Sequence, residues 1–295
     1  MSRLHIRTPA LTRVMLAAVM LAAAVPALTI QPAWADTAAS AKKKAAAQQA
    51  APAATGTDAG TDQTQQGERI DNAMQYKHCV ALARQKPDEG WEESLAWGSL
   101  GGGDAAKHCG AIALIGLKQY EEAATRLEAL AQDSKGPAKL RAGMLAQAGQ
   151  AWLLAKKPEQ AYAAQTSALK LVPDAPDLLI DRAESLAEAK NYKDAKADLD
   201  RSIAVDPSRV EAYVFRAAAK RFLDDLPGAA QDCAKAVELD PNYQDAWLES
   251  GIVRRLQGDN AGARQAWAKV LELAPDSNAA DDARRNIELL DVKTQ

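Results

Sequence analysis

Small residues return at a fixed interval through the C-terminal half of the chain. Four prolines stand 34 residues apart, and the residues five, twelve and twenty-four places before each proline are small or apolar. The prolines are Pro173, Pro207, Pro241 and Pro275, and the small or apolar residues are Ala168, Ser202, Ala236 and Val270, then Ala161, Ala195, Ala229 and Ala263, then Gly149, Ala183, Ala217 and Gly251. Alanine is abundant and strand-like β-branched runs are scarce, which favours closely packed helices. The pattern therefore predicts an internal repeat of helical units.

This pattern resembles the tetratricopeptide repeat, with its period of 34 residues, its small residues and its closing proline. In that family each repeat is a pair of antiparallel helices, whose backbones approach closely only where the side chains are small. The proline ends the second helix and directs the chain into the next pair. The resemblance implies an all-α fold, a right-handed α-solenoid of antiparallel helix pairs with helical caps.

Reading the register outward from the prolines gives five repeats. We expect them at 104–137, 142–175, 176–209, 210–243 and 244–277, followed by a polar C-terminal capping helix within 278–295. Turns between paired helices are expected at Lys118-Gln119, Lys156-Lys157-Pro158, Lys190-Asn191, Asp224-Asp225 and Gly258-Asp259. The first repeat is the most divergent, because its proline is missing from the usual place.

The segment before the repeats divides into two parts. Residues 68–103 show helical spacing of apolar residues interrupted by Pro87, and we expect a divergent N-terminal helical cap there. Residues 36–67 are a low-complexity stretch of Ala, Gln, Thr, Gly and Asp, which predicts a disordered linker. Its three lysines at 42–44 are either solvated chain or a contact for an anionic surface.

The first thirty-five residues have the features of a signal peptide. Arg3, Arg7 and Arg13 precede the uncharged apolar run 14–25, and the small-x-small triplet 33–35 follows. A retained membrane anchor is the alternative, but the run is shorter than the roughly 20 residues that a spanning helix needs. We therefore expect cleavage after Ala35, a periplasmic or secreted product, and no stable membrane span afterwards.

Charge argues against nucleic acid as a partner. The chain carries 36 basic and 39 acidic residues, and three of the basic ones lie in the signal peptide. The mature chain then holds 33 basic residues against 39 acidic ones, a net charge of −6. No basic stripe is left for a phosphate backbone.

Two residue pairs recur in register and predict structural ion pairs. Arg182 and Asp198 occupy the seventh and twenty-third places of their repeat, and Arg216 and Asp232 occupy the same places in the next. Those places face each other across a helix pair. A repeated structural pair that closes each hairpin is therefore favoured over a charged functional site.

The two cysteines near the N-terminal end of the repeats allow two interpretations. Cys79 and Cys109 lie on different helices, and an oxidising compartment would allow them to form a disulfide. Each follows a histidine, His78 and His108, so a zinc site is the alternative. Neighbouring helical residues point about 100° apart, which disfavours the zinc site. Cys233 is expected to be a small core residue.

Catalytic chemistry is not expected. Outside the signal peptide the only histidines are the two that precede cysteines, and GxSxG, HExxH and phosphate-loop motifs are absent from the sequence. No cofactor and no metal are therefore expected, and we predict that the protein is not an enzyme.

The resemblance also implies a binding surface. In such arrays the concave wall is built from the first helix of each repeat, with places two, five, nine, twelve and thirteen facing inward. On this sequence the predicted partner-binding residues are Gln150, Leu153, Asp177, Ile180, Glu184, Glu211, Val214, Arg221, Asp245, Leu248, Ile252 and Arg255. The lysines and asparagines with which one subclass clamps a C-terminal carboxylate are missing from these places.

These features predict a non-catalytic scaffold of the bacterial cell envelope that binds a protein or peptide in the groove. The alternatives are a structural binder of peptidoglycan or glycan, for which Trp91 and Trp97 would be the exposed rings, and an accessory subunit of an envelope enzyme. The identity of the partner, the process served and the oligomeric state do not follow from the sequence.

Overall fold

The computed structural model describes the backbone of residues 60–292 and the side chains of residues 72–291. The signal peptide, its cleavage site and the predicted linker up to residue 59 lie outside the described residues. Every regular element from residue 60 to 292 is an α-helix, as the repeat pattern predicts. None of these helices is both long enough and apolar enough to cross a membrane.

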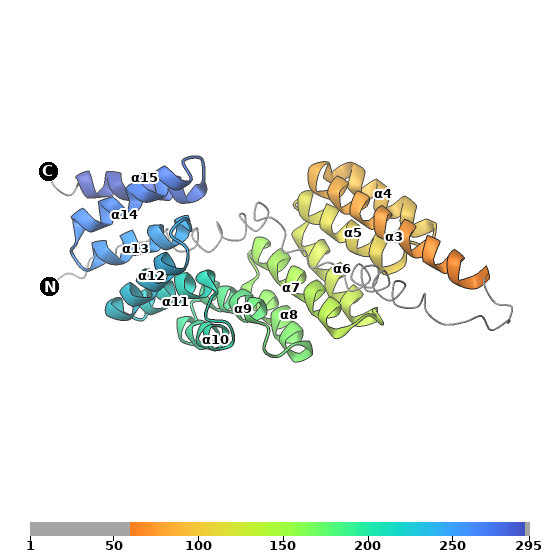
Figure 1. Cartoon of the computed structure of the whole chain (residues 1–295), viewed down its shortest axis with the longest axis horizontal. Coiled ribbons are helices and arrows are strands. Elements are labelled where there is room, and N and C mark those ends of the chain that lie inside the picture. Colours follow the sequence, from red (N-terminus) through yellow and green to blue (C-terminus); the bar gives the residue numbers. More distant parts are fainter. Residues whose placement is uncertain (1–59, 293–295) are drawn as a thin grey trace, which may run out of the picture. The chain divides into compact units, whose positions relative to one another are not determined.

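The described chain divides into two compact units. One contains residues 60–157 with 170–172, and the other contains residues 158–169 and 173–292. In the N-terminal unit the helices are α3 (Gly60–Gln85), α4 (Pro87–Ser99), α5 (Gly103–Gly116), α6 (Tyr120–Asp133) and α7 (Ala138–Leu154). In the C-terminal unit they are α8 (Pro158–Leu171), α9 (Pro176–Glu188), α10 (Tyr192–Val205), α11 (Val210–Phe222), α12 (Leu226–Leu239), α13 (Gln244–Leu256), α14 (Asn260–Leu273) and α15 (Asn278–Val292) (Figure 1).

The turn inside each predicted repeat has the same backbone conformation. The fifteenth place of all five repeats has a positive φ, between 61° and 63° at Lys118, Lys156, Lys190 and Asp224 and 89° at Gly258. In the last three repeats the next residue is Asn or Asp, and its side chain accepts a hydrogen bond from the amide three residues on, which caps the second helix. The five predicted turns therefore all lie between helices.

The prolines and the small residues occupy the places that the register assigns to them. The four prolines each stand two residues beyond the end of a second helix, after α8, α10, α12 and α14. The alanines twelve residues before them are fully buried: Ala161, Ala195, Ala229 and Ala263. Helix α5 packs against α6, α9 against α10, α11 against α12 and α13 against α14. The helix pairs thus approach where the side chains are small.

One close approach depends on a glycine. Gly251 on α13 faces the indole of Trp267 on α14, and a Cβ at Gly251 would overlap that ring. Trp267 is fully buried and its Nε1 donates a hydrogen bond to the carbonyl oxygen of Leu248, 3.2 Å away. At the corresponding places of the third repeat the pair is Ala183 and Leu199. The two places vary together, so that a smaller residue on one helix accommodates a larger one on the other.

The N-terminal cap is held by a disulfide. Cys79 on α3 and Cys109 on α5 are bonded, with a Cα–Cα distance of 6.1 Å, and both are fully buried. They lie in a core with Ala83, Trp97 and Ala113. The bond joins α5, the first helix of the first repeat, to the irregular segment before it. It also uses both sulfurs, so neither thiolate is left for the alternative zinc site.

Two boundaries differ from the sequence prediction. Helix α3 begins at Gly60, eight residues inside the stretch for which a linker was predicted, because polar Gln and Thr tolerate a helix that the apolar pattern does not mark. The division between the two compact units falls after Lys157, between α7 and α8, and therefore inside the second predicted repeat.

Candidate partner-binding surface

In the C-terminal unit the first helices of successive repeats form one wall. Helix α9 contacts α11, α11 contacts α13, and α13 contacts α15. Each of the first three is also packed against its own second helix, α10, α12 or α14. The α15 helix therefore continues the row of first helices after the last full repeat, as the predicted C-terminal capping helix.

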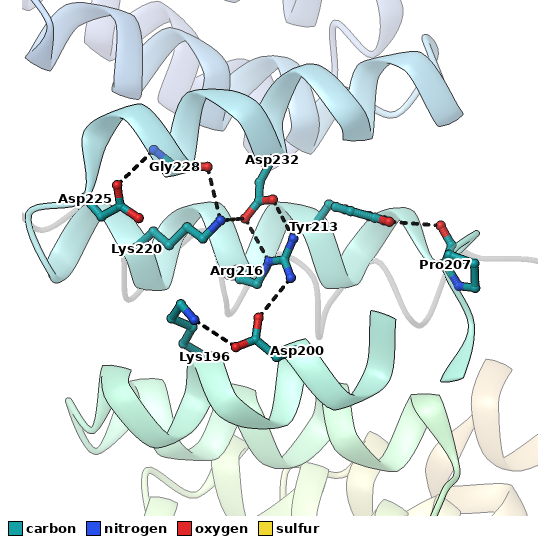
Figure 2. Close-up of polar contacts among 9 residues, drawn as sticks. All are labelled: Lys196, Asp200, Pro207, Tyr213, Arg216, Lys220, Asp225, Gly228 and Asp232. Carbon is teal, nitrogen blue, oxygen red and sulfur yellow. Dashed lines mark hydrogen bonds and ion pairs between the residues drawn. The ribbon is translucent and has the colours of Figure 1, made fainter. Parts of the chain in front are cut away.

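An ion-pair ladder fixes the helices behind this wall (Figure 2). Nε and Nη2 of Arg216 donate to the two carboxylate oxygens of Asp232, at 2.9 and 2.7 Å, inside one helix pair. Nη1 of Arg216 donates to Asp200 on α10, the second helix of the preceding repeat, at 2.9 Å. Lys220 adds a further ion pair to Asp232 at 2.8 Å. One guanidinium therefore joins both the two helices of a repeat and two successive repeats.

The arginine–aspartate pair inside the repeat also occurs one repeat earlier and is absent one repeat later. Arg182 donates to both oxygens of Asp198, at 2.7 and 2.6 Å, so both predicted structural ion pairs are present. In the last repeat the two places hold Ser250 and Ala266. Where the arginine is missing, a cleft of about 520 Å³ lies between α12 and α13, with Trp247 in its lining.

Burial and hydrogen bonding have opposite effects on the pKa of Asp200, the carboxylate that links two successive repeats in the ladder. Partial burial of Asp200 raises its pKa, but hydrogen bonds from Lys196 and Arg216 outweigh that effect and lower the pKa below its usual value. Asp200 is therefore ionised at neutral pH and keeps the ladder intact.

Half of the predicted partner-binding residues are less accessible than the concave wall of the family implies. Gln150 and Leu153 lie on α7 in the N-terminal unit, and the other ten lie in the C-terminal unit. Six of the twelve are buried: Leu153, Ile180, Glu184, Val214, Asp245 and Leu248. They are buried because adjacent first helices pack directly on one another. Their assignment to partner binding stays a prediction.

Three more of the predicted residues are engaged in ion pairs. Arg221 donates to both oxygens of Glu249 at 2.6 and 3.2 Å, and the Glu249 side chain is completely buried. Asp177 is bonded to Arg209, which also lies 3.9 Å from Glu211. Arg221 is thus a structural residue of the wall, since its removal would leave a buried carboxylate without a partner.

Asp245 is a buried carboxylate of the wall. Burial raises its pKa to about 6, a hydrogen bond with Tyr243 opposes that rise, and the charge of Asp282 on α15 adds to it. Its Oδ1 has no hydrogen-bond partner among the described residues. Asp245 therefore destabilises the folded unit when it is ionised.

Exposed leucines at the ends of the first helices are a feature that sequence reasoning missed. Leu223 follows α11, Leu256 ends α13, and Leu289 lies near the end of α15. Their exposed fractions are 43%, 55% and 45%, whereas most leucines of the repeats are buried. These three leucines, called the apolar row below, occupy places fourteen, thirteen and twelve of successive units. The recurrence of leucine near the end of each first helix could have indicated this row in the sequence. It is hard to recognise because the leucine moves by one place from each unit to the next.

Next to the apolar row stands a cation without a described partner. Arg255, on α13 beside Leu256, is partly exposed. Among the ion pairs of the described residues none includes Arg255, whereas its neighbour Arg254 lies 3.6 Å from Asp259. The half-exposed Ile252 is one helical turn away. Arg255 therefore has no ion-pair partner among the described residues, whereas Ile252 packs in part against the core around Leu248 and Trp267.

The two aromatic rings proposed for glycan binding are not freely exposed to solvent. Trp97 is only 7% exposed and belongs to the disulfide core, so the expectation that it is an exposed ring is wrong. Trp91 is half-buried, and the guanidinium of Arg126 lies 5.1 Å from the centre of its ring. Both rings pack against glycines, since Trp97 lies against Gly102 and Trp91 lies against Gly110, where no Cβ stands in the way.

The described histidines do not form a catalytic pair. His78 is exposed, whereas His108 is buried between Tyr76 and Gln147, with both ring nitrogens 2.7 Å from their partners. Burial lowers the pKa of His108 and raises that of Tyr76 to about 12. Among the described residues no group of three or more His, Cys, Asp and Glu side chains is arranged to hold a metal ion.

Comparison with known proteins adds little to these observations. No family model matches the chain, and no curated protein matches it. The solved structure of MamA 41-end from Desulfovibrio magneticus RS-1 is 24% identical, covers 57% of this chain and 93% of its own, and has a TM-score of 0.48. YrrB, described as a TPR protein with an unusual peptide-binding site, is 20% identical, covers 61% and 91%, and has a TM-score of 0.45. The first TPR of Spaghetti (RPAP3), bound to an HSP90 peptide, is 26% identical, covers 41% and 95%, and has a TM-score of 0.39.

Because these TM-scores are modest, the assignment depends on the chain itself. Its period of 34 residues is matched by turns of one conformation at the fifteenth place, by prolines beyond the second helices and by packed helix pairs. These features give the chain an all-α solenoid fold of helix pairs that resembles the tetratricopeptide repeat.

Proposed function

We propose that this protein is a non-catalytic scaffold of the bacterial cell envelope, which binds a segment of another protein along the first-helix wall of its C-terminal unit. The observation that carries the proposal is the apolar row. Three leucines with 43% to 55% exposure stand at equivalent ends of three successive first helices, and Arg255, which pairs with no described residue, precedes one of them. An extended or helical segment that covers them would bury apolar surface at each repeat.

The ladder behind the wall supports the same function. It fixes α10, α11 and α12 relative to one another through Arg216. A wall that does not rearrange on binding loses little conformational entropy, which favours affinity. The remaining polar networks of the described unit are structural pairs of this kind and offer no nucleophile with an adjacent base.

The envelope location is supported by two features of different kinds. The basic start, the apolar run and the small-x-small triplet of residues 1–35 are those of an export signal. The buried disulfide between Cys79 and Cys109 is of the kind that persists in oxidising compartments. We expect the native protein in the periplasmic fraction to begin at residue 36, by N-terminal sequencing; a full-length chain in the membrane fraction would contradict the export proposal.

The binding proposal is tested by reversing the polarity of the apolar row. The double variant Leu256→Asp and Leu289→Asp should lose the proteins that the wild type captures after cross-linking in living cells. The measurement is quantitative mass spectrometry of the affinity-purified complexes. Both side chains are about half exposed, so the change should leave folding intact, which circular dichroism checks.

Val205→Asp is the matched control. Val205 is 48% exposed at the end of α10, a second helix, and it is not part of the apolar row. The control should retain the wild-type set of captured proteins. If the double variant and the control capture the same proteins as the wild type, the first-helix wall is not the binding surface.

A further inference from the structure

The fifth repeat lacks the arginine that closes the two repeats before it. In the fourth repeat Arg216 joins Asp232 of its own repeat to Asp200 of the preceding one (Figure 2). The corresponding places of the fifth repeat hold three small side chains, Ser250, Ala266 and Ala234. Ser250 and Ala234 line the cleft of about 520 Å³ between α12 and α13. A cleft of this size is large enough to hold a side chain of another molecule.

The cleft is suited to an uncharged group. The arginine and both of its carboxylates are replaced together, so none of the charges of the ladder is left there. Of the side chains that line the cleft only Arg254 and Asp259 are charged, and they lie 3.6 Å from each other. Most of the lining is apolar, with Val237, Trp247 and Val253 among it. A charged group buried here would find no free opposite charge to offset its desolvation.

An aromatic ring forms part of the cleft wall. Trp247 stands at the fourth place of its repeat, and Tyr213 stands at the same place one repeat earlier. Each ring is fixed by a hydrogen bond to the carbonyl oxygen six residues before it, at 2.8 Å for Trp247 and 3.2 Å for Tyr213. The guanidinium of Arg216 lies 5.5 Å from the centre of the Tyr213 ring. Ser250, which stands in place of that arginine, is too short to cover Trp247, so the indole can pack against an incoming ring.

The cleft also contains a buried hydroxyl group that forms no hydrogen bond with any described residue. This group is the Oγ of Ser250, a residue that is 8% exposed. By contrast, the buried Ser185 donates to Gln165 at 2.6 Å, and the buried Ser202 donates to the carbonyl oxygen of Pro176 at 3.2 Å. A buried hydroxyl without a partner is unfavourable, and a ligand that hydrogen-bonds to it removes that cost.

We propose that the cleft between α12 and α13 is a second binding site, which takes an aromatic side chain of a partner protein and prefers tyrosine. The ring packs against Trp247, Val237 and Val253, and the phenol hydroxyl forms a hydrogen bond with Ser250. Leu256 of the apolar row is about 200° further around α13 than Arg254 of the cleft, because successive helical residues are about 100° apart. The cleft is therefore distinct from the apolar row, and the inference goes beyond the proposed function.

The experiment measures the binding of three defined peptides to the mature full chain with isotope-labelled tryptophan. The peptides are acetylated, amidated pentapeptides in which Tyr, Phe or Arg stands between two pairs of glycines. The indole NMR signal of Trp247, assigned by its loss in Trp247→Phe, reports on the cleft. The tyrosine peptide should shift this signal saturably, and the phenylalanine peptide should bind about fivefold more weakly for want of one neutral hydrogen bond. The arginine peptide should not shift it.

Ser250→Ala tests the hydrogen bond separately from the packing. In this variant the tyrosine peptide should bind no more tightly than the phenylalanine peptide, whose affinity should not change. The matched control is Ser167→Ala on α8, where the hydroxyl already donates to the carbonyl oxygen of Ala163 at 3.0 Å. The control should keep the preference for tyrosine.

A further variant fills the cleft with the ladder of the preceding repeat. Ser250→Arg, Ala266→Asp and Ala234→Asp together reproduce the residues of the fourth repeat, so the variant should keep its helix content by circular dichroism and bind neither aromatic peptide. The proposal is overturned if the tyrosine peptide causes no saturable shift, if the arginine peptide binds equally well, or if the preference for tyrosine persists in Ser250→Ala. Binding of the aromatic peptides to the folded, filled variant would also overturn it.

A last comparison separates the cleft from the apolar row. Leu256→Asp with Leu289→Asp should leave the affinity for the tyrosine peptide unchanged, and its loss would contradict a distinct site. If no peptide binds the cleft while this double variant still abolishes capture in cells, the inference fails and the proposed function stands.

Discussion

At the scale of single residues, two acids of the wall are held in an unfavourable state. Glu184 on α9 and Asp245 on α13 are both buried, and burial raises the pKa of each. Glu184 has like charges on its own helix, and Asp245 faces Asp282 on α15. By contrast, Asp198, Asp232 and Glu249 are equally buried but are bonded to arginine. Unmatched burial thus distinguishes two positions of the wall from the structural pairs behind it.

The raised pKa of Asp245 predicts how stability depends on pH. The folded-state pKa is about 6, above the value of 3.8 for an unperturbed aspartate, so the folded state binds more protons than the unfolded state between these values. Stability contributed by protonated Asp245 is therefore complete below pH 4 and is lost as the pH rises to 6 and above. The full effect is about 3 kcal/mol, at 1.4 kcal/mol for each pKa unit.

Asp245→Asn should remove this dependence. Urea unfolding of the wild type and the variant between pH 4 and pH 7 should give free energies of unfolding that diverge above pH 5, with the variant the more stable. Asp206→Asn is the control and should not gain stability above pH 5, because hydrogen bonds from Ser208 lower the pKa of Asp206. Parallel curves for the wild type and Asp245→Asn would contradict the assignment of the raised pKa.

The sequence alone predicts the roles of some of these residues. The arginine–aspartate pairs were predictable because both partners recur in register, which tied them to the fold. The pairing of Arg221 with Glu249 was not, because it joins successive first helices and occurs once. The burial of Glu184 and Asp245 was not predictable either. It depends on how closely neighbouring first helices pack, and the repeat pattern does not indicate that distance.

At the scale of elements, two helix pairs show complementary residue sizes at two facing places. The third repeat has Ala183 opposite Leu199, and the fifth has Gly251 opposite Trp267. The larger ring fits because the glycine has no Cβ, and its indole also donates to the carbonyl oxygen of Leu248. Small-residue places that look interchangeable in the sequence are therefore specific to their partner helix.

Gly251→Ala tests this matching. The new Cβ would overlap the Trp267 indole, so the variant should lose about 2 kcal/mol of unfolding free energy by overpacking. In the Trp267→Leu background, which restores the combination found in the third repeat, the same change should cost less than about 0.5 kcal/mol or stabilise, because helix interiors favour alanine over glycine by about 1 kcal/mol. The check is a double-mutant cycle by urea unfolding; additive costs would show that the two sites are not in contact.

The elements themselves were largely predictable from the sequence. Turn residues such as Lys190-Asn191 and Asp224-Asp225 mark the helix ends because an αL residue and a capping side chain are needed at those places. The start of α3 at Gly60 was not predictable, because Gln, Thr and Asp give no apolar period. The rings of Trp91 and Trp97 were misjudged because the irregular cap has no register from which to infer burial.

At the scale of the whole molecule, the described chain consists of two compact units with different stabilising devices. The N-terminal unit has a disulfide with a sequence separation of 30 residues, and the C-terminal unit has the arginine–aspartate ladder. Cys233, the remaining cysteine among the described residues, is buried and free. Because the single disulfide lies in one unit, its loss should affect that unit alone.

We predict that removal of the disulfide destabilises the N-terminal unit only. The double variant Cys79→Ala and Cys109→Ala should destabilise the N-terminal unit by about 3 kcal/mol. Without the disulfide, the unfolded chain gains the conformational entropy that closing a loop of roughly this length had removed. Hydrogen exchange followed by mass spectrometry should show faster exchange in α3, α4 and α5 and unchanged exchange in α9 to α14. Equal loss of protection in both units would mean that they unfold as one cooperative body, contrary to this expectation.

The central claim is that a partner binds the first-helix wall of the C-terminal unit. A photoreactive amino acid placed at Leu256, on the wall, and separately at Val205, on a second helix, tests it most directly in living cells. The two side chains are exposed to 55% and 48%, so they differ in position far more than in accessibility. We expect discrete cross-linked products from position 256 and none from position 205. Cross-linked products from position 205 alone, or the same products from both positions, would contradict it.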